Sequence, residues 1–224
     1  MTRARFSDQI RTAVSDEWAR AHVDHPTVKG IGDGTLSMDR FRYYMSQDYL
    51  FLIEYCRVIA LAAAKSPDLE SMSRWASLLD ETLNSEMELH RSFCADFGIA
   101  PAELEATVAS PTTLAYTGHL LGVARAGTIE EITAAMLPCQ WGYDEIGRVL
   151  AEQDQAPAGS LHRRWIDGYN STEYQAMTEW LRNFTDRLAS ESSDATRAQM
   201  QAHFAESTRH EHAFWEAAWN REPA

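Results

Sequence analysis

The sequence predicts an all-α fold in a single domain that spans residues 1–224. Apolar residues recur at helical spacing in most segments, beginning with Phe6, Ile10, Val14 and Trp18, and no segment alternates with the period of two that marks a strand. Hydrophobic residues make up 45% of the chain and charged residues 24%, which is enough apolar material for a sizeable core. No linker, internal repeat or low-complexity tract divides the chain, so we expect one multi-helix bundle.

Turn residues divide the first half of the chain into its expected elements. Pro26 and the glycines of residues 30–34 interrupt the first helical pattern, and no strand-like segment precedes these glycines, so we expect a turn rather than a phosphate cradle. The expected elements are a helix from residue 6 to about 18, a turn over residues 25–34, a helix capped by Ser37 that runs to about residue 65, a helix over residues 66–98, and a short segment over residues 101–106.

The second half is helical by the same criteria. Pro111 opens a fourth helix that Gly127 closes, and Thr128-Ile129-Glu130-Glu131 forms a capping box for the fifth, which reaches about residue 153. A turn covers residues 156–159. The remaining helices cover about 160–168, 172–190 and 194–219, which gives seven or eight helices in all.

The charge balance narrows the classes of partner. The chain has 20 Lys and Arg against 33 Asp and Glu, a formal net charge of −13 with His neutral, and such a surface repels nucleic acid and anionic lipid heads. No apolar run approaches the ~20 residues of a membrane-spanning helix, and the N-terminus lacks the apolar core of a signal peptide, so we expect a cytoplasmic protein. Three scattered cysteines without CxxC spacing argue against a disulfide framework and a thiolate zinc site.

One carboxylate interrupts an apolar face in the second helix. Phe41, Tyr44, Asp48, Phe51 and Tyr55 are spaced 3, 4, 3 and 4, so Asp48 sits among four aromatic rings on one face. Burial of a carboxylate is costly unless it has partners. Two interpretations stay open: a structural aspartate bonded to a neighbouring hydroxyl or helix end, and a carboxylate that receives a polar ligand in an aromatic pocket.

The last helix repeats this pattern. Phe204, Thr208, Glu211 and Trp215 follow one another at intervals of 4, 3 and 4, which places Glu211 on or near an apolar face. Charged residues and histidines surround it in the sequence. The pattern therefore allows either a functional carboxylate or a partly exposed residue at the rim of the core.

The fifth helix contains a proline followed directly by a cysteine. Pro138 removes a backbone hydrogen bond, so we expect a kink or a restart of the helix there. Cys139 would then lie near free amides at a positive helix end, which would lower the pKa of its thiol, and Tyr143 lies one turn further on. Cys139 is thus either a buried small residue or a nucleophile, whereas Cys56 and Cys94 lack this arrangement.

Histidines and carboxylates raise the question of a metal site. Glu86 and His90 have a spacing that suits a metal pair on one helix face, and His203, His210 and His212 cluster near the end of the chain. Helices of this kind build di-iron sites in bundle cores, but the usual Glu-x-x-His pairing from two separate helices is absent. A helix-surface pair and a solvated, His-rich terminus are the expected explanations, with no metal bound.

Six segments match one family pattern in order and with similar separations. Together they resemble the TenA family (thiaminase II, aminopyrimidine aminohydrolase), and the resemblance covers nearly the whole length of the chain. The segments are residues 41–52 (FRYYMSQDYLFL), 86–90 (EMELH), 115–120 (AYTGHL), 137–147 (LPCQWGYDEIG), 165–169 (WIDGY) and 207–215 (STRHEHAFW).

The resemblance implies a fold, an assembly and an activity. The fold would be all-α and similar to haem oxygenase, assembled as a homotetramer, with no haem, no metal and no other cofactor. The activity would be hydrolysis of the small molecule 4-amino-5-aminomethyl-2-methylpyrimidine to its 5-hydroxymethyl analogue, a salvage step for thiamin breakdown products. Cleavage of thiamin itself between its pyrimidine and its thiazolium is the second activity of the family.

The resemblance also implies roles for individual residues. Cys139 would be the nucleophile, Glu211 the acid and base, and Asp48 the group that holds the pyrimidine's amino group and ring nitrogen. The pocket would be lined by four aromatic residues, Phe51, Tyr116, Tyr143 and Tyr169. Of the tyrosines, Tyr116 is the one expected to pass or hold a proton near the nucleophile.

Two positions depart from the family pattern. His210 precedes the acid where many relatives have tyrosine, and Phe51 lacks a hydroxyl that some relatives carry, although neither change removes a group that the chemistry requires. Cys139 places the chain in the cysteine-bearing branch. Two other functions are kept as alternatives: a haem-oxygenase-like di-iron oxidase that uses Glu86, His90 and the C-terminal histidines, and a non-catalytic pyrimidine-binding or regulatory protein.

Overall fold

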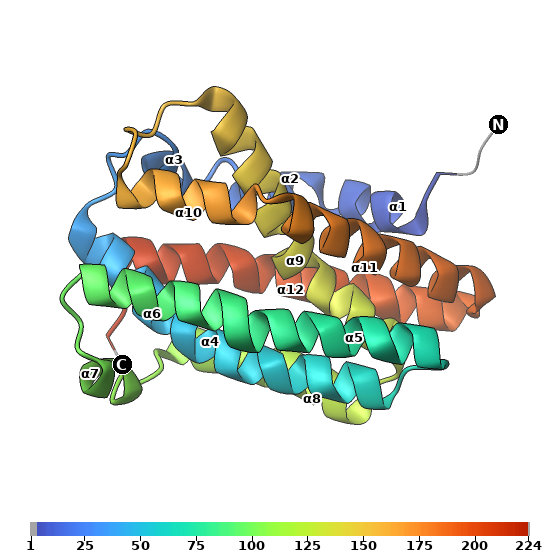
Figure 1. Ribbon diagram of the computed structural model, residues 1–224. Helices are drawn as coiled ribbons and strands as arrows, with labels where there is room; N and C mark the ends of the chain where they lie inside the picture. The colour runs from blue at the N-terminus through green and yellow to red at the C-terminus, as the bar shows by residue number, and fades with distance from the viewer. Residues whose placement is uncertain (1–3, 224) are drawn as a thin grey trace. The chain divides into compact units, whose positions relative to one another are not determined.

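The computed structural model describes residues 4–223, which are helical with connecting turns (Figure 1). The predicted all-α class is confirmed: these residues form twelve α-helices and one π-helical turn, and no strand. None of the helices in this range is long and apolar enough to cross a membrane. Contacts divide the described residues into two compact units, and helix α12 (Asp194–Asn220) contributes to both. One domain over residues 1–224 stays a prediction.

The first unit comprises residues 4–36 and 130–215. Trp18 lies in its core, where it stacks on Phe204 with 5.6 Å between the ring centroids and meets Trp141 at 5.2 Å. These contacts tie the N-terminal helices to the later ones of the unit. Its helices are α1 (Phe6–Ala13), α2 (Ser15–Ala21), α3 (Pro26–Gly32), α9 (Ile129–Gln153), α10 (Leu161–Tyr169), α11 (Thr172–Glu191) and most of α12.

The second unit comprises residues 37–129 and 216–223. Its long helix α4 packs against α5, α6 and α8, so α4 is the central element of this unit. Phe41 of α4 contacts Phe93 and Phe97 at 5.9 and 5.4 Å between centroids, which anchors α6 to α4. The helical elements are α4 (Met38–Ala64), α5 (Leu69–Glu81), η1 (Thr82–Glu86), α6 (Met87–Asp96), α7 (Pro101–Glu105), α8 (Pro111–Ala126) and the last turn of α12.

The N-terminal segment differs from its predicted form in two places. The first helical pattern is split at Val14, where the backbone turns between α1 and α2. The predicted turn over residues 25–34 is wrong for most of its length, because Pro26 at the first helical position starts α3. Only its end is a turn: Gly34 has a φ of +77°, a conformation that favours glycine.

The predicted helix over residues 66–98 is three segments. The first of them, α5, begins after Asp68 and not at residue 66, because the side chain of Asp68 accepts a hydrogen bond from the backbone N–H of Ser71. The π-helical turn η1 then separates α5 from α6, although the two helices continue along nearly one line in Figure 1. Gly98, with a φ of +73°, closes α6 as its position in the sequence predicts.

The predicted boundaries of the later helices are confirmed. Pro111 occupies the first turn of α8, and the Ser110 hydroxyl accepts a hydrogen bond from the backbone N–H of Thr113. Helix α9 ends at residue 153 as expected, and α10, α11 and α12 lie within a few residues of their predicted ranges.

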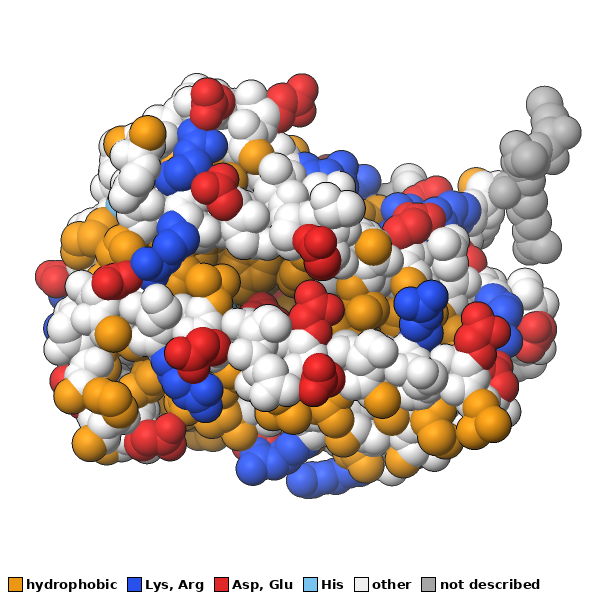
Figure 2. Space-filling model, in the orientation of Figure 1, with side chains coloured by type: hydrophobic (Ala, Val, Ile, Leu, Met, Phe, Trp, Pro, Cys, Tyr) orange, Lys and Arg blue, Asp and Glu red, His pale blue; other side chains and the backbone are white. Residues whose placement is uncertain are grey.

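The molecular face in Figure 2 carries acidic and basic side chains interspersed with apolar ones. No broad basic patch is visible on this face.

Candidate active site

Asp48 lies on α4 of the second unit with only 3% of its surface exposed. Its Oδ2 accepts two hydrogen bonds, from the Tyr44 hydroxyl at 3.1 Å and from Nε2 of His90 at 2.6 Å. Its Oδ1 accepts no hydrogen bond from residues 4–223. The carboxylate therefore has structural partners on one oxygen and a free acceptor on the other, so it combines features of both predicted interpretations.

Both ring nitrogens of His90 face acceptors. Nδ1 lies 2.9 Å from the backbone oxygen of Glu86, and Nε2 faces the Asp48 carboxylate. Both nitrogens can donate at once only in the imidazolium form. Burial acts to lower the pKa of His90, but the hydrogen bond and charge of Asp48, together with the charge of Glu86, raise it overall. Asp48 and His90 therefore form a buried, charge-assisted pair.

Two of the predicted pocket residues lie beside this pair in the second unit. Phe51 follows Asp48 by three residues on α4, and the Tyr116 ring on α8 lies 4.9 Å from the Phe51 ring between centroids. Tyr55 continues the aromatic row, 5.6 Å from Phe51. The second unit thus presents a carboxylate next to flat aromatic side chains.

The other predicted residues belong to the first unit. Tyr143 lies on α9, one turn after Cys139, and its ring meets that of Tyr169 at 5.0 Å between centroids. Trp165 and Trp215 complete this aromatic cluster, at 6.0 and 5.5 Å from Tyr143. Close approach of α9 to the end of α10 depends on Gly147, since a Cβ there would lie 2.6 Å from the backbone carbon of Tyr169.

Glu211 is buried on α12, with 1% of its surface exposed. It lies one turn before Trp215, whose ring stacks on Tyr143 of α9. Cys139 likewise lies one turn before Tyr143. The carboxyl and the thiol are therefore carried by two helices that contact each other through their neighbouring aromatic residues. The possibility that Glu211 is an exposed rim residue is excluded by its burial.

The predicted restart of the helix at Pro138 is wrong. Helix α9 runs without interruption through Pro138, so Cys139 lies well inside the helix and not beside the free amides of a helix end. The expected reason for a lowered thiol pKa therefore does not apply.

The carbonyl oxygen of Pro138 lies 3.2 Å from Nε2 of the buried His22, and burial lowers the pKa of His22 to about 4.

The three cysteines differ in their surroundings. Burial, with the negative charge of Glu86, raises the pKa of the Cys56 thiol to about 11, and burial raises that of Cys94 to about 11 as well. A raised pKa favours the protonated thiol at neutral pH, which is a weaker nucleophile than the thiolate. Cys139 is 9% exposed, and none of the three cysteines forms a disulfide within residues 4–223.

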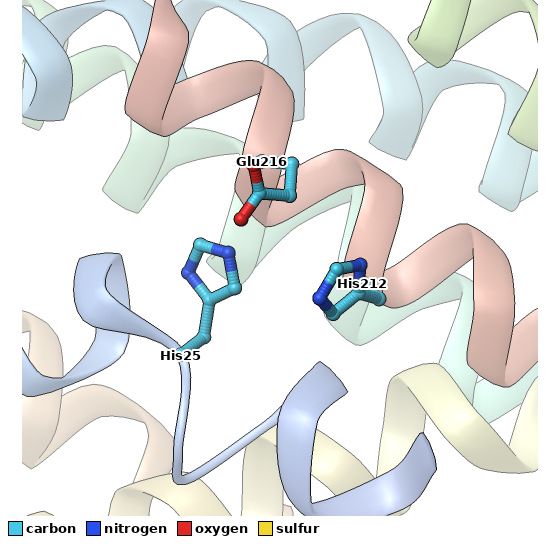
Figure 3. A group of neighbouring side chains, drawn as sticks. All are labelled: His25, His212 and Glu216. Atoms are coloured by element: carbon cyan, nitrogen blue, oxygen red, sulfur yellow. The ribbon is translucent and has the colours of Figure 1, made fainter.

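One group of three potential metal ligands occurs among residues 4–223. The ligand atoms of His25, His212 and Glu216 lie within 4.8 Å of one another, and the side chains point toward each other (Figure 3). Both His212 and Glu216 are carried by α12, one turn apart. The group contains neither Glu86 nor His90, which the di-iron alternative requires.

The hydrogen bond that His25 accepts does not suit a metal. Nδ1 of His25 accepts a hydrogen bond from the backbone N–H of Thr27 at 3.1 Å. In the neutral ring the single proton is then on Nε2, which leaves no lone pair there for a metal. Metal-bound histidines show the reverse pattern, in which the second nitrogen donates. We therefore do not propose a metal centre at this group.

The partnership of His90 with Asp48 was not predicted from the sequence. The expected surface pair of His90 with Glu86 is wrong, because the ring is buried and turned to the backbone oxygen of Glu86. Trp165 and Trp215 were not predicted as members of the aromatic cluster around Tyr143. The one available signal for the tryptophans was their place in the same segments as Tyr169 and Glu211.

Comparison with known families gives one match that spans most of the chain. Residues 12–221 match the model of the TENA/THI-4/PQQC family. Three similar curated proteins are named aminopyrimidine aminohydrolase. They come from Halalkalibacterium halodurans (42% identical, covering 89% of each chain), Bacillus subtilis (38% identical, covering 97% of this chain and 91% of the relative) and Helicobacter pylori (35% identical, covering 88% and 91%).

Solved structures of TenA proteins are also similar to this chain. A protein from Silicibacter described as a TenA family transcription regulator is 30% identical, with a TM-score of 0.89 over 96% of each chain. A TenA homologue from Pyrococcus horikoshii is 26% identical, with a TM-score of 0.88 over 97% of this chain and 99% of that one. A Shewanella domain with a heme oxygenase-like fold, 14% identical, has a TM-score of 0.77 over 96% and 92%, which supports the predicted fold type.

Proposed function

We propose that this chain, which belongs to the TENA/THI-4/PQQC family, is an aminopyrimidine aminohydrolase of thiamin salvage. Its reaction would convert 4-amino-5-aminomethyl-2-methylpyrimidine and water into the 5-hydroxymethyl compound and ammonia. The observation that carries the proposal is its 35–42% identity, over most of its length, to three relatives of that name. The buried polar and aromatic residues supply the groups that such a reaction needs.

Substrate binding is assigned to the carboxylate and the aromatic side chains. Asp48 accepts a hydrogen bond from the pyrimidine through Oδ1, the oxygen that residues 4–223 leave without a partner. Flat aromatic walls suit a planar ring. We assign these walls to Phe51, Tyr116, Tyr143 and Tyr169, all of which are buried.

The first half of the proposed reaction expels the amine. The Cys139 thiolate forms a bond to the ring carbon next to the substituted carbon, and the displaced electron pair moves onto a ring nitrogen. Electrons of the dearomatised ring then break the bond from the methylene carbon to the amine. The amine nitrogen takes that pair and a proton from Glu211, which leaves an exocyclic methylene group.

The second half restores the aromatic ring. Water adds to the methylene carbon while Glu211 takes up its proton, and the electrons return to the ring. Departure of the Cys139 thiolate then completes the cycle, with the thiolate and the acid regenerated. We assign to Tyr116 the role of passing or holding a proton near the thiol. These steps need side chains and water alone, so no cofactor is proposed.

Thiamin is proposed as a second substrate, because it carries the same methylene carbon bonded to nitrogen. Its leaving group is a thiazole, which departs as a neutral ring. Which of the two substrates is preferred depends on how each leaving group is accommodated beside Glu211.

The direct test is turnover by the purified protein. Incubation with the aminomethylpyrimidine should give the hydroxymethylpyrimidine and one equivalent of ammonia, measured by chromatography and an ammonia assay. Thiamin should be tested in parallel for release of the thiazole. Tight binding of the pyrimidine without any product would instead support a regulatory protein, and the absence of both binding and turnover would refute the proposal.

We propose further that the protein is a homotetramer in the cytoplasm. The resemblance to the TenA family suggests four chains, and seven Trp and eight Tyr supply aromatic anchors of the type that interfaces use. Three cysteines that form no disulfide within residues 4–223 suit a reducing compartment. Light scattering at micromolar concentration should give about four times the chain mass of 25.3 kDa, and a mass equal to one chain would contradict the tetramer.

A further inference from the structure

We infer that His90 positions Asp48 for the substrate: together with Tyr44 it occupies Oδ2, so that Oδ1 is the oxygen that accepts an N–H from the aminopyrimidine. This inference rests on the proposed function, because it concerns how the same site holds its ligand. His90 acts through Asp48 and not on the reacting atoms, so it is a positioning residue.

The geometry fixes the orientation of the carboxylate. Rotation about the bond to the carboxyl carbon would exchange the two oxygens of Asp48, and this rotation would break the bonds from Tyr44 and His90 together. The two donors come from different places: Tyr44 lies one turn earlier on α4, and His90 comes from α6. The carboxylate is therefore held from two helices, with Oδ1 left to the ligand.

The proton of the pair stays on the histidine. With Nδ1 committed to the backbone oxygen of Glu86, a protonated Nε2 gives an imidazolium against the carboxylate. If Asp48 carried the proton instead, one of its two oxygens would act as a hydrogen-bond donor and only the other would be a good acceptor. With the proton on His90, Oδ1 keeps its lone pairs and its negative charge, which makes its bond to a ligand N–H a charge-assisted one.

This arrangement narrows the role that the family resemblance assigns to Asp48. The resemblance implies contacts from the carboxylate to both the amino group and the ring nitrogen of the pyrimidine. Because Oδ2 already accepts two hydrogen bonds, the ligand meets one oxygen and not a bidentate pair. The amino group of the pyrimidine is the donor that suits that oxygen.

Three variants separate positioning from structural support. His90→Leu removes both donors, whereas His90→Gln keeps an amide N–H near the place of Nε2. Asp48→Asn removes the carboxylate that His90 would hold, so a double variant with His90→Leu measures the coupling between the two residues. The matched control is His162→Leu, since His162 is also buried, but its Nε2 faces the backbone oxygen of Leu36.

The expected result is a loss of binding that depends on the carboxylate. His90→Leu should raise KM for the aminomethylpyrimidine, and Kd for the hydroxymethyl product, by about 10- to 100-fold, with a smaller change in kcat. His90→Gln should recover most of this loss, and His162→Leu should leave KM unchanged. In the Asp48→Asn background, His90→Leu should raise KM and Kd by less than a further factor of about 3, because no charged oxygen remains to be positioned.

A second measurement tests the pair without any ligand. Nuclear magnetic resonance of ¹⁵N-labelled histidine should show His90 as an imidazolium at pH 7, and as a neutral ring in Asp48→Asn. A neutral His90 in the wild type would overturn the inference even if the enzyme turns over its substrate. Fully additive effects of the two substitutions on Kd, or a folded His90→Leu protein with unchanged KM, would overturn it as well.

The proposed function can fail separately. An imidazolium in the wild type and coupled effects on product binding, without turnover, would support the positioning role and refute the aminohydrolase. If His90→Leu does not fold, the ¹⁵N measurement on the wild type and on Asp48→Asn still decides the question, because both of these proteins keep His90.

Discussion

Replacement of Cys139 by serine should lower turnover of the aminomethylpyrimidine by orders of magnitude while the protein stays folded. A thiol ionises near pH ~8.5 in its unperturbed state, whereas a serine hydroxyl is hardly ionised at neutral pH and is a much weaker nucleophile toward a ring carbon. The volume change is small, so the packing of α9 should survive. The measurement is kcat for wild type and variant, with the thermal midpoint recorded for both.

Labelling gives an independent readout of the same cysteine. Iodoacetamide should inactivate the wild type by modifying one site, and the hydroxymethyl product should protect it. Cys56 and Cys94, whose thiol pKa values are raised to about 11, should react slowly in the folded protein. Cys94→Ala serves as the control and should keep its activity. Retention of most activity in Cys139→Ser, or a protectable label on another cysteine, would refute the covalent mechanism.

Replacement of Glu211 by glutamine should leave a protein that binds the pyrimidine but hardly turns it over. The amide can still form hydrogen bonds, but it cannot deliver a proton to the leaving amine or take one from water. Glu211 is buried on α12, so an isosteric change is the one least disruptive to packing. Calorimetry with the hydroxymethyl product should give an affinity close to that of the wild type, while kcat falls by at least ~100-fold.

A change of leaving group sharpens this test. The decrease in kcat caused by Glu211→Gln should be smaller for thiamin than for the aminomethylpyrimidine, because the thiazole leaves as a neutral ring and needs no proton. The matched control is Glu206→Gln, a half-buried carboxylate on the same helix that pairs with Arg209. Equal losses for both substrates would limit Glu211 to the water-addition step, and an active Glu211→Gln protein would rule it out as the acid.

Local sequence signals were sufficient for most of the fold. Capping residues and prolines at first turns placed α8 and α9 to within a residue, because these devices act on the backbone next to them. The failures have a different origin. Gly30 and Gly32 were taken as turn residues, but α3 forms because it packs in the core, where both glycines are buried. Pro138 was expected to kink or restart α9, and the helix continues through this position, where the neighbouring residues are buried.

The candidate site was predicted one helix at a time. The spacing of aromatic residues around Asp48 and Glu211 identified each carboxylate as an interruption of a buried face, and both residues are buried. What spacing could not supply is a partner from another helix. His90 lies 42 residues from Asp48, and nothing in its own segment indicates which carboxylate it meets. Tertiary packing decides that, so the pair appears only in three dimensions.

In the π-helical turn η1, the number of residues matters more than their identity. Leu83, Asn84 and Ser85 are exposed, and substitutions there should be tolerated. Deletion of one of them would convert the turn to ordinary α-helix, and every later residue of α6 would rotate by about 100° around the helix axis. His90 would then leave the face that meets α4. This exposed turn is therefore a spacer. Its number of residues sets the rotational position of His90 on α6, and so decides whether His90 meets Asp48.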